Sequence, residues 1–324
     1  MAKEIKTIGV LTSGGDAPGM NAAVRAIVRA GISKGYRMMG IQRGYNGLIN
    51  GECYEMNVRS VSEIIHRGGT ILYTARCLGF KTKEGQAKGL ARCKELGIDA
   101  LVVIGGDGSF MGARALANQG IPCVGIPGTI DNDIACSEYT IGYDTAMNTA
   151  VEAIDKLRDT TQSHDRCSVV EVMGHHAGYI ALNVGIATGA LAVLLPERPF
   201  DFERDILQRM RQTQVTGKKH FIIIVSEGVT DAQTLANQIQ AATGVDSRAT
   251  VLGHIQRGGS PTVRDRVNAS LMGYHAVDLL DKGIYNRVVA LSGGKIVDYD
   301  VNVALSMHKY LDPMEIEVAQ AISI

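Results

Sequence analysis

The chain has 324 residues, which is enough for about two domains that each bury a sizeable core. Its 33 Lys and Arg residues balance 33 Asp and Glu residues, and this zero formal charge argues against nucleic acid as a partner. Apolar residues make up 45% of the chain and charged residues 20%, which excludes a disordered protein.

Short β-branched runs alternate with amphipathic stretches along the chain, a pattern typical of strand-helix units in a parallel sheet. The expected strands are 7–11, 101–105, 122–126, 168–172, 191–195, 221–226, 249–252 and 287–291. The expected helices are 18–31, 109–118, 142–159, 177–188, 231–242 and 262–282, with Asp231 and Pro261-Thr262 as start signals. No Ser/Gly/Pro-rich linker divides the chain, and we place a domain boundary near residue 142.

Two segments repeat the order strand, Gly-Gly-Asp, helix: residues 8–16 and 101–109. At the carboxyl ends of parallel strands, two such loops would meet at one crevice. Their glycines let backbone N–H groups at a helix start come close to a phosphate. Neither segment matches a P-loop or a GxGxxG fingerprint, and an ordinary tight turn is the alternative.

Three further acidic residues follow expected strands. Asp107 comes after two glycines at the end of an apolar strand, where an exposed carboxylate suits magnesium beside triphosphate oxygens; a helix N-cap is the alternative. In the run 127–133, an extended backbone would place Asp131 and Asp133 on one face. One carboxylate could then take a proton from an attacking hydroxyl while the other lies nearer the metal; a surface turn is the alternative.

Several basic residues could bind phosphate. The run 254–259, His-Ile-Gln-Arg-Gly-Gly, combines two side-chain donors with two glycine amides. Arg166 and Arg248 add further guanidinium groups, and Arg25 and Arg29 lie one helical turn apart, where they could hold a second anion. Solvated surface charges are the alternative for all four arginines.

Six cysteines lie far apart, without a CxxC pair or a zinc-type spacing, which predicts reduced thiols in a cytosolic protein. Apolar runs such as 221–225 are too short to cross a bilayer, and the stretch after Met1 is too short for a signal-peptide core. We therefore expect a cytoplasmic protein with no membrane partner.

Four motifs in order resemble those of bacterial ATP-dependent 6-phosphofructokinases. They are Thr12-Ser-Gly-Gly-Asp-Ala-Pro-Gly-Met-Asn21, Gly105-Gly-Asp-Gly-Ser109, Pro127-Gly-Thr-Ile-Asp-Asn-Asp133 and Gly253-His-Ile-Gln-Arg-Gly-Gly-Ser-Pro261. The resemblance spans nearly the whole chain. It implies an α/β fold of two similar three-layer domains with largely parallel sheets. The larger, ATP-binding domain would comprise 1–142 plus 256–306, and the smaller, fructose-6-phosphate-binding domain 143–255 plus 307–324.

The resemblance also implies the activity, which is transfer of the ATP γ-phosphoryl group to the 1-hydroxyl of fructose 6-phosphate, the committing step of glycolysis. Asp131 matches the catalytic base, Thr129 orients the transferred group, and Asp107 serves Mg²⁺. The matched ATP-binding positions are Gly15, Tyr45, Arg76, Cys77, Gly106, Asp107, Gly108 and Ser109. The matched positions for the sugar phosphate are Thr129, Asp131, Asp133, Met173, Gly174, His175, Glu227, His254 and Arg257, together with Arg166 and Arg248 from a neighbouring subunit of a homotetramer.

The chain departs from the family at several positions. His175 replaces an arginine that helps to hold the reacting phosphate, which predicts weaker transition-state support at pH 8, because an imidazole is largely neutral in alkali. At the family's site for ADP or phosphoenolpyruvate, the matched residues are Arg25, Arg29, Glu63, Arg158, Gly189, Lys218 and His220, with Arg59 one place late. Leu191 replaces an acid, Thr216 a lysine and Val58 an arginine. We predict blunted activation by Mg-ADP, which a tenfold shift in half-saturation on adding ADP would refute.

The residues leave three alternative functions open. Pyrophosphate-using relatives carry bulkier residues at positions 108 and 128, so the glycines here favour ATP over pyrophosphate as donor. A related kinase of lipids or nicotinamide dinucleotide fits less well, since Arg166, Arg248 and Arg257 suit a sugar phosphate. A catalytically weak sugar-phosphate sensor is compatible with His175 but not with intact Asp107 and Asp131.

Overall fold

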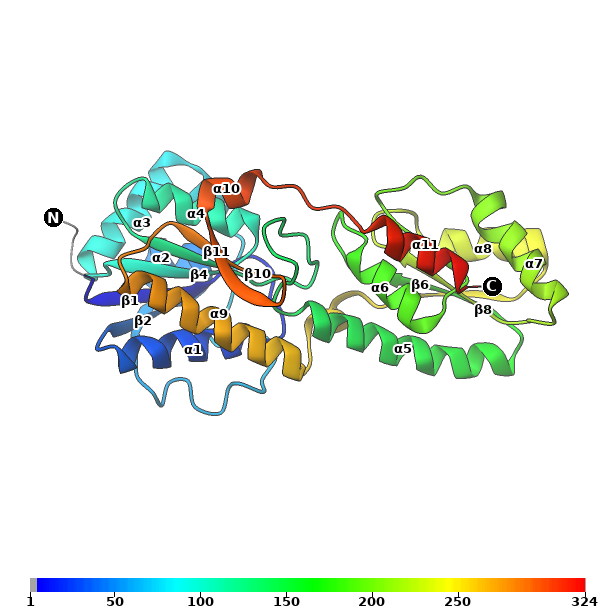
Figure 1. Ribbon diagram of the computed structural model, residues 1–324, viewed down its shortest axis with the longest axis horizontal. Coiled ribbons are helices and arrows are strands. Elements are labelled where there is room, and N and C mark those ends of the chain that lie inside the picture. Colours follow the sequence, from blue (N-terminus) through cyan, green and yellow to red (C-terminus); the bar gives the residue numbers. More distant parts are fainter. Residues whose placement is uncertain (1–4, 324) are drawn as a thin grey trace. The chain divides into compact units, whose positions relative to one another are not determined.

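A computed structural model describes residues 5–323, so positions 1–4 and 324 of the expected domains lie outside the described part. The chain forms two compact units. Unit 1 contains Met1–Ile130, Ile134–Thr145 and Arg257–Lys309, and unit 2 contains Asp131–Asp133, Ala146–Gln256 and Tyr310–Ile324. Each unit is built around its own sheet (Figure 1).

The sheet of unit 1 has the strand order β11-β10-β5-β4-β1-β2-β3. Its strands are β1 (Thr7–Thr12), β2 (Arg37–Ile41), β3 (Cys53–Met56), β4 (Ala100–Gly105), β5 (Cys123–Pro127), β10 (Arg287–Ser292) and β11 (Lys295–Asp300). The central strands run parallel, whereas β3 and β11 pair antiparallel at the two edges. β1 and β4 are buried along their whole length, as expected for central strands covered on both faces.

Helices cover both faces of this sheet. They are α1 (Met20–Ser33), α2 (Gly44–Asn50), α3 (Lys83–Glu95), α4 (Asp107–Ala117), α9 (Val263–Asp281) and α10 (Val301–Ser306), with a 3₁₀ turn, η1, at Leu78–Lys81. Side chains of α2, α3 and α4 pack on one face. Helices α1 and α9 lie together on the other face (Figure 1). This arrangement places the loops after β1, β4 and β5 at one edge of the sheet.

Unit 2 contains a smaller parallel sheet with the order β7-β8-β6-β9. Its strands are β6 (Cys167–Val172), β7 (Ala192–Leu194), β8 (Phe221–Ser226) and β9 (Ser247–Val251). Its helices are α5 (Tyr143–Ser163), whose first turn belongs to unit 1, α6 (Tyr179–Thr188), α7 (Gln208–Val215), α8 (Ala232–Thr243) and α11 (Pro313–Ala321), with shorter turns η2 (Glu203–Leu207) and η3 (Gly253–Arg257).

Alternate residues of these strands are buried on opposite faces of the small sheet. Val169 of β6 and Ile223 of β8 pack with α7 and α8. Ser168, which points to the other face, hydrogen-bonds Thr161 of α5 at 2.5 Å. The unit is therefore a three-layer structure with helices on both sides of a parallel sheet, and the expected α/β class with largely parallel sheets is confirmed.

All eight expected strands and all six expected helices are present, with ends shifted by at most a few residues. Asp231 and Thr262 cap α8 and α9 by accepting bonds from Thr234 N and Asp265 N. The short or polar elements β2, β3, β11, α2, α3, α7, α10 and α11 were not expected, because edge strands and exposed helices carry weak apolar periodicity. No helix in the described part of the chain is long and apolar enough to span a membrane.

Candidate active site

The two Gly-Gly-Asp loops lie side by side in unit 1, because β1 and β4 are parallel neighbours. Ser13 N donates to Ile104 O at 2.9 Å, and Ser109 Oγ donates to Ser13 O at 3.3 Å. A Cβ on Gly105 would lie 2.5 Å from Ser13 O, so only glycine allows the loops to approach this closely. The two loops therefore meet at the carboxyl ends of β1 and β4.

The two loops differ in their relation to a helix. Helix α4 begins at Asp107, so Gly105 and Gly106 lead directly into a helix N-terminus. Helix α1 begins only at Met20, so Gly14 and Gly15 are not at a helix start, and that part of the expectation is wrong. The intervening Ala17-Pro18-Gly19 turn, with Gly19 at φ 107°, is the physical reason for the delay.

Arg257 lies against the first loop. A Cβ on Gly15 would come within 2.6 Å of Arg257 Nη1, so glycine leaves the space that the guanidinium occupies. The Nε of Arg257 is buried and has no hydrogen-bond partner among residues 5–323. A cation thus stands beside a glycine-lined loop in unit 1, which suits an anionic ligand.

Asp107 is an exposed residue in the first turn of α4, and the N-cap position is taken by Gly106. The N-cap alternative for Asp107 is therefore wrong, because the helix already starts at Asp107, one residue earlier than a cap at 107 would require. A Cβ on Gly108 would meet no described atom within 4 Å, whereas one on Gly128 would press on Ile104 and Met20. Open space therefore adjoins Asp107 in unit 1.

Tyr45 packs against the second Gly-Gly-Asp loop, at residues 105–109. Its hydroxyl donates to Ser109 O at 2.6 Å, and its ring stacks on Phe80 with centroids 4.1 Å apart. The residue is 4% exposed, and burial raises the pKa of its hydroxyl. Arg76 is exposed and Cys77 half-buried in the segment that leads to Phe80. Tyr45, one of these three expected ATP-site residues, therefore stabilises the second Gly-Gly-Asp loop through its hydrogen bond to Ser109.

The run after β5 is not extended as expected. Asn132 adopts φ 53°, and residues 130–131 form a bend, so the alternation of a strand does not relate Asp131 to Asp133. Asparagine tolerates this left-handed backbone better than most residues, which is why the turn forms here. Asp131 and Asp133 both belong to unit 2 and are both half-buried.

A second loop of unit 2 is held through its backbone amides. Met173 N donates to Gln256 Oε1 at 2.8 Å, and Gly174 N and His175 N donate to Glu227 Oε1 at 3.4 and 2.6 Å. His175 has φ 58° and its side chain is 61% exposed. Glu227 thus shapes the loop that carries His175.

The same loop comes close to the acidic run. The Nδ1 atom of His175 lies 3.9 Å from Oδ2 of Asp133, and its ring lies 4.2 Å from the ring of His176. Unit 2 therefore brings together His175, Asp133 and Glu227. His254, another expected site residue, is exposed in η3.

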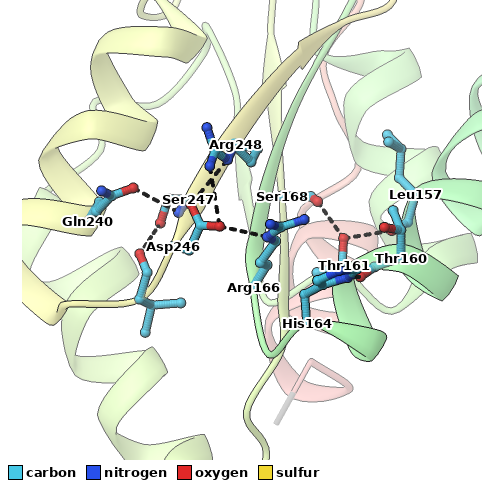
Figure 2. A network of polar contacts seen from close by, with 11 residues as sticks. Leu157, Thr160, Thr161, His164, Arg166, Ser168, Gln240, Asp246, Ser247 and Arg248 are labelled. Atoms are coloured by element: carbon cyan, nitrogen blue, oxygen red, sulfur yellow. Dashed lines mark hydrogen bonds and ion pairs between the residues drawn. The ribbon is translucent and has the colours of Figure 1, made fainter.

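Arg166 and Arg248 converge on one carboxylate in unit 2 (Figure 2). Arg166 Nε donates to Asp246 Oδ2 at 2.6 Å, and Arg248 Nε lies 3.1 Å from Asp246 Oδ1. The hydrogen bond from Arg166 lowers the pKa of Asp246, and Arg248 adds to that effect. The guanidinium group of Arg166, which directly precedes β6, is thereby held together with that of Arg248 on β9. Asp246 was not identified from the sequence as a partner of these arginines. The only signal in the sequence is that Asp246 stands two residues before Arg248.

The expected effector residues fall in both units. Within unit 2, burial lowers the pKa of Lys218, and nearby Arg158 lowers it further. Burial followed by the charges of Lys218 and Arg158 lowers the pKa of His220, so three basic groups are neighbours. Arg158 also donates to Thr188 O, beside Gly189 at the end of α6. In unit 1, Arg25 and Arg29 lie on α1, and Arg59 and Glu63 lie in an exposed segment.

Leu191, one of the positions that depart from the family's effector site, is apolar and buried. It is 1% exposed and belongs to the core cluster between β7, β8 and α8. A magnesium-linked acid could not function in that apolar surrounding without disrupting the core.

Comparisons with known proteins agree with this architecture. Residues 7–280 match the family model described as phosphofructokinase. Curated proteins named ATP-dependent 6-phosphofructokinase from Clostridium botulinum and Clostridium novyi are 54% identical over 319 residues, which is 98% of this chain and the whole of each relative. The solved phosphofructokinase of Saccharomyces cerevisiae is 34% identical with a TM-score of 0.87; the match covers 98% of this chain but 46% of the yeast chain. A pyrophosphate-dependent phosphofructokinase from Marinobacter aquaeolei shares the fold at 22% identity and a TM-score of 0.84, covering 95% of this chain and 86% of that one.

Proposed function

The chain belongs to the phosphofructokinase family, and we propose that its residues perform transfer of the ATP γ-phosphoryl group to the 1-hydroxyl of fructose 6-phosphate. The names of the full-length bacterial relatives support this activity and support ATP as the phosphoryl donor. The single structural observation that carries the proposal is the pairing of glycine-rich loops, with Asp107 at the start of α4. Such a loop and helix start suit the phosphates of a nucleotide.

We assign ATP to unit 1 and fructose 6-phosphate mainly to unit 2. Gly15, Arg76, Cys77 and the loop 106–109 would bind ATP, with Tyr45 bracing that loop. Arg257 would neutralise phosphate charge beside Gly15. The sugar phosphate would contact Asp133, Met173, Gly174, Glu227 and His254 of unit 2, together with Arg166 and Arg248 of a neighbouring subunit.

Catalysis in this proposal is mostly positioning and charge neutralisation. Asp131 takes the proton from the sugar 1-hydroxyl, which then attacks the γ-phosphorus. Thr129, two residues earlier in the chain, orients the transferred group. His175 stands near Asp133 and supplies a hydrogen-bond donor toward the phosphate. Each group acts on charge that develops during transfer.

The donor set fits Mg²⁺ held largely by the nucleotide. Within residues 5–323, no three His, Cys, Asp or Glu side chains form a metal-binding group. Magnesium in kinases is commonly bound through one or two carboxylates together with phosphate oxygens and waters, and Asp107 supplies one exposed carboxylate. When bound, the ion neutralises charge on the phosphate oxygens.

The remaining parts of the proposal concern assembly and regulation. We propose a homotetramer, in which Arg166 and Arg248 serve a neighbouring subunit, and a cytoplasmic location, which the free thiols of all six cysteines support. ADP or phosphoenolpyruvate would bind near Arg158, Lys218 and His220, where three basic groups cluster in unit 2.

The decisive test replaces the proposed base. Asp131→Asn should lower kcat about 10²- to 10⁴-fold, because the amide cannot accept the proton, while KM for both substrates changes little. A coupled assay with ATP and fructose 6-phosphate measures both constants. Asp155→Asn, the same chemical change at an exposed position of α5, is the matched control and should keep the parent kcat. Parent-level turnover by Asp131→Asn would exclude the proposed mechanism.

A further inference from the structure

Asp265 is a fully buried carboxylate outside the substrate-contact set. It lies in the first turn of α9, directly after the 253–261 motif, and is 0% exposed. Its Oδ1 accepts from Tyr139 Oη and, at 2.7 Å, from Gly142 N. Its Oδ2 accepts from Thr145 Oγ1 and, at 2.9 Å, from Thr145 N. All four donors come from one short segment, residues 139–145.

No lysine or arginine within residues 5–323 forms an ion pair with Asp265, so its charge is balanced by these four donors. Arg264 is engaged elsewhere, over the Tyr139 ring with its guanidinium carbon 4.7 Å from the centroid. Burial raises the pKa of Asp265, and the hydrogen bonds from Thr145 and Tyr139 oppose that shift. A buried carboxylate held by hydrogen bonds alone is costly, so its presence calls for a specific role.

The segment that Asp265 holds forms the backing of the run that contains Thr129. Ile141 N donates to Pro127 O at 2.9 Å, and Thr129 N donates to Ile141 O at 3.1 Å. Thr140 Oγ1 also donates to Thr129 O at 2.7 Å. The backbone at Thr129 is therefore set by residues 140–141 as much as by β5.

The same segment also packs against the first glycine-rich motif. A Cβ on Gly142, which has φ 103°, would lie 2.6 Å from the Cβ of Ala17. A Cβ on Gly19 would lie 2.7 Å from Ile141 and 3.4 Å from the Cβ of Asp265. Little free space remains, so a shift of residues 139–142 would be passed on to the neighbouring loops of unit 1.

We propose that Asp265 is a positioning residue for phosphoryl transfer: by holding residues 139–145, it sets the backbone of the 127–129 run and thereby the place of Thr129. The inference rests on the proposed role of Thr129 in the reaction. It links the 12–21 motif and residues 127–129, which are distant in sequence, to one carboxylate in unit 1. A misplacement of about 1 Å at reacting groups can cost about 10²-fold in rate, so even a small shift has a large effect.

The test uses Asp265→Asn in the full-length protein. The substitution replaces one carboxylate oxygen, which accepts two hydrogen bonds, by an NH₂ group, which cannot accept them. Residues 139–145 should therefore be held less firmly. We expect kcat to fall tenfold or more while KM for ATP and for fructose 6-phosphate stays within about twofold, as for a change in the transition state alone. Hydrogen exchange measured by mass spectrometry should quicken in peptides covering 127–142 and stay unchanged in peptides covering 287–300.

The matched control is Asp298→Asn in the same unit. Asp298, on the edge strand β11, accepts bonds from His275 of α9 and from Arg287 at the start of β10, so this variant should lose stability with an unchanged kcat. Its faster exchange should appear in peptides covering 295–300, whereas the amides of Thr129 and Ile141, which bond to each other's segment, should exchange as in the parent. Tyr139→Phe removes one donor only and keeps the fold testable if Asp265→Asn does not fold; its kcat should fall severalfold.

The outcomes separate this inference from the proposed function. Unchanged exchange in 127–142, or a kcat loss no larger than that of Asp298→Asn, would overturn the positioning role. A fully active Asp131→Asn would instead remove the proposed chemistry and leave the exchange result standing.

Discussion

His175 shows how one side chain can alter a site whose backbone is unchanged. Its amide is held by Glu227 at 2.6 Å, so the loop geometry does not depend on the side chain. The imidazole is exposed and lies 3.9 Å from Asp133; the family resemblance implies an arginine at this position. An arginine would stay charged at every relevant pH and could donate two bonds to one phosphate, whereas an imidazole cannot.

At the residue scale, we therefore predict that His175→Arg raises kcat severalfold at pH 8. The gain is expected because a guanidinium offers two parallel N–H donors and a permanent charge to one phosphate. Steady-state kinetics at pH 8 measure the effect. His176→Arg, at the exposed neighbour, is the control and should change neither constant. Equal kcat and KM for parent and His175→Arg at pH 8 would show that the arginine is dispensable.

Strand β7 shows how an element limits what regulation the chain can carry. Leu191 directly precedes β7, and its amide donates to Ile222 O at 2.8 Å in the neighbouring strand β8. Its side chain is enclosed by the core under α8. An acid at this position would have to leave the core to reach a metal-bound effector, which the pairing with β8 opposes.

At the element scale, Leu191→Glu should lower the free energy of unfolding by about 3 kcal/mol or more, because it buries an unpaired charge. It should also fail to restore activation by Mg-ADP. Urea denaturation and assays with and without ADP measure the two effects. Leu191→Met, which conserves volume, should cost less than about 1.5 kcal/mol. A stable, ADP-activated Leu191→Glu protein would contradict the expectation.

The proposed subunit assembly makes a prediction at the scale of the whole molecule. In the proposed assembly, the pair formed by Arg166 and Arg248, which Asp246 holds together, binds the sugar phosphate of a neighbouring subunit. Asp131 and Arg248 of one active site then belong to different chains. The 34.6-kDa chain should then form a tetramer.

Mixing two defective variants tests this arrangement. Asp131→Asn and Arg248→Ala should each have low activity at subsaturating fructose 6-phosphate. Dissociated and reassembled together, they should recover part of the parent activity, since some sites combine an intact Asp131 with an intact Arg248. The control mixes Asp131→Asn with Arg257→Ala, because Arg257 packs against the glycine-rich loop of its own chain. Shared sites predict that activity recovers in the Asp131→Asn and Arg248→Ala mixture and not in the control mixture. The opposite result would contradict shared sites.

The sequence by itself determined the strands, the long helices and the glycine-rich motifs, because these depend on residues close together in the chain. Asp231, for example, caps α8 through an amide only three residues away. Tertiary structure alone decided which distant groups meet. Asp265 joins Tyr139 across 126 residues, and Asp246 joins Arg166 across 80. The left-handed turn at Asn132, which replaces the extended backbone expected for 127–133, likewise depends on how the run after β5 is held. Local hydrogen bonds and periodicity can be read from neighbouring residues, whereas such contacts exist only once the sheets and helices have packed.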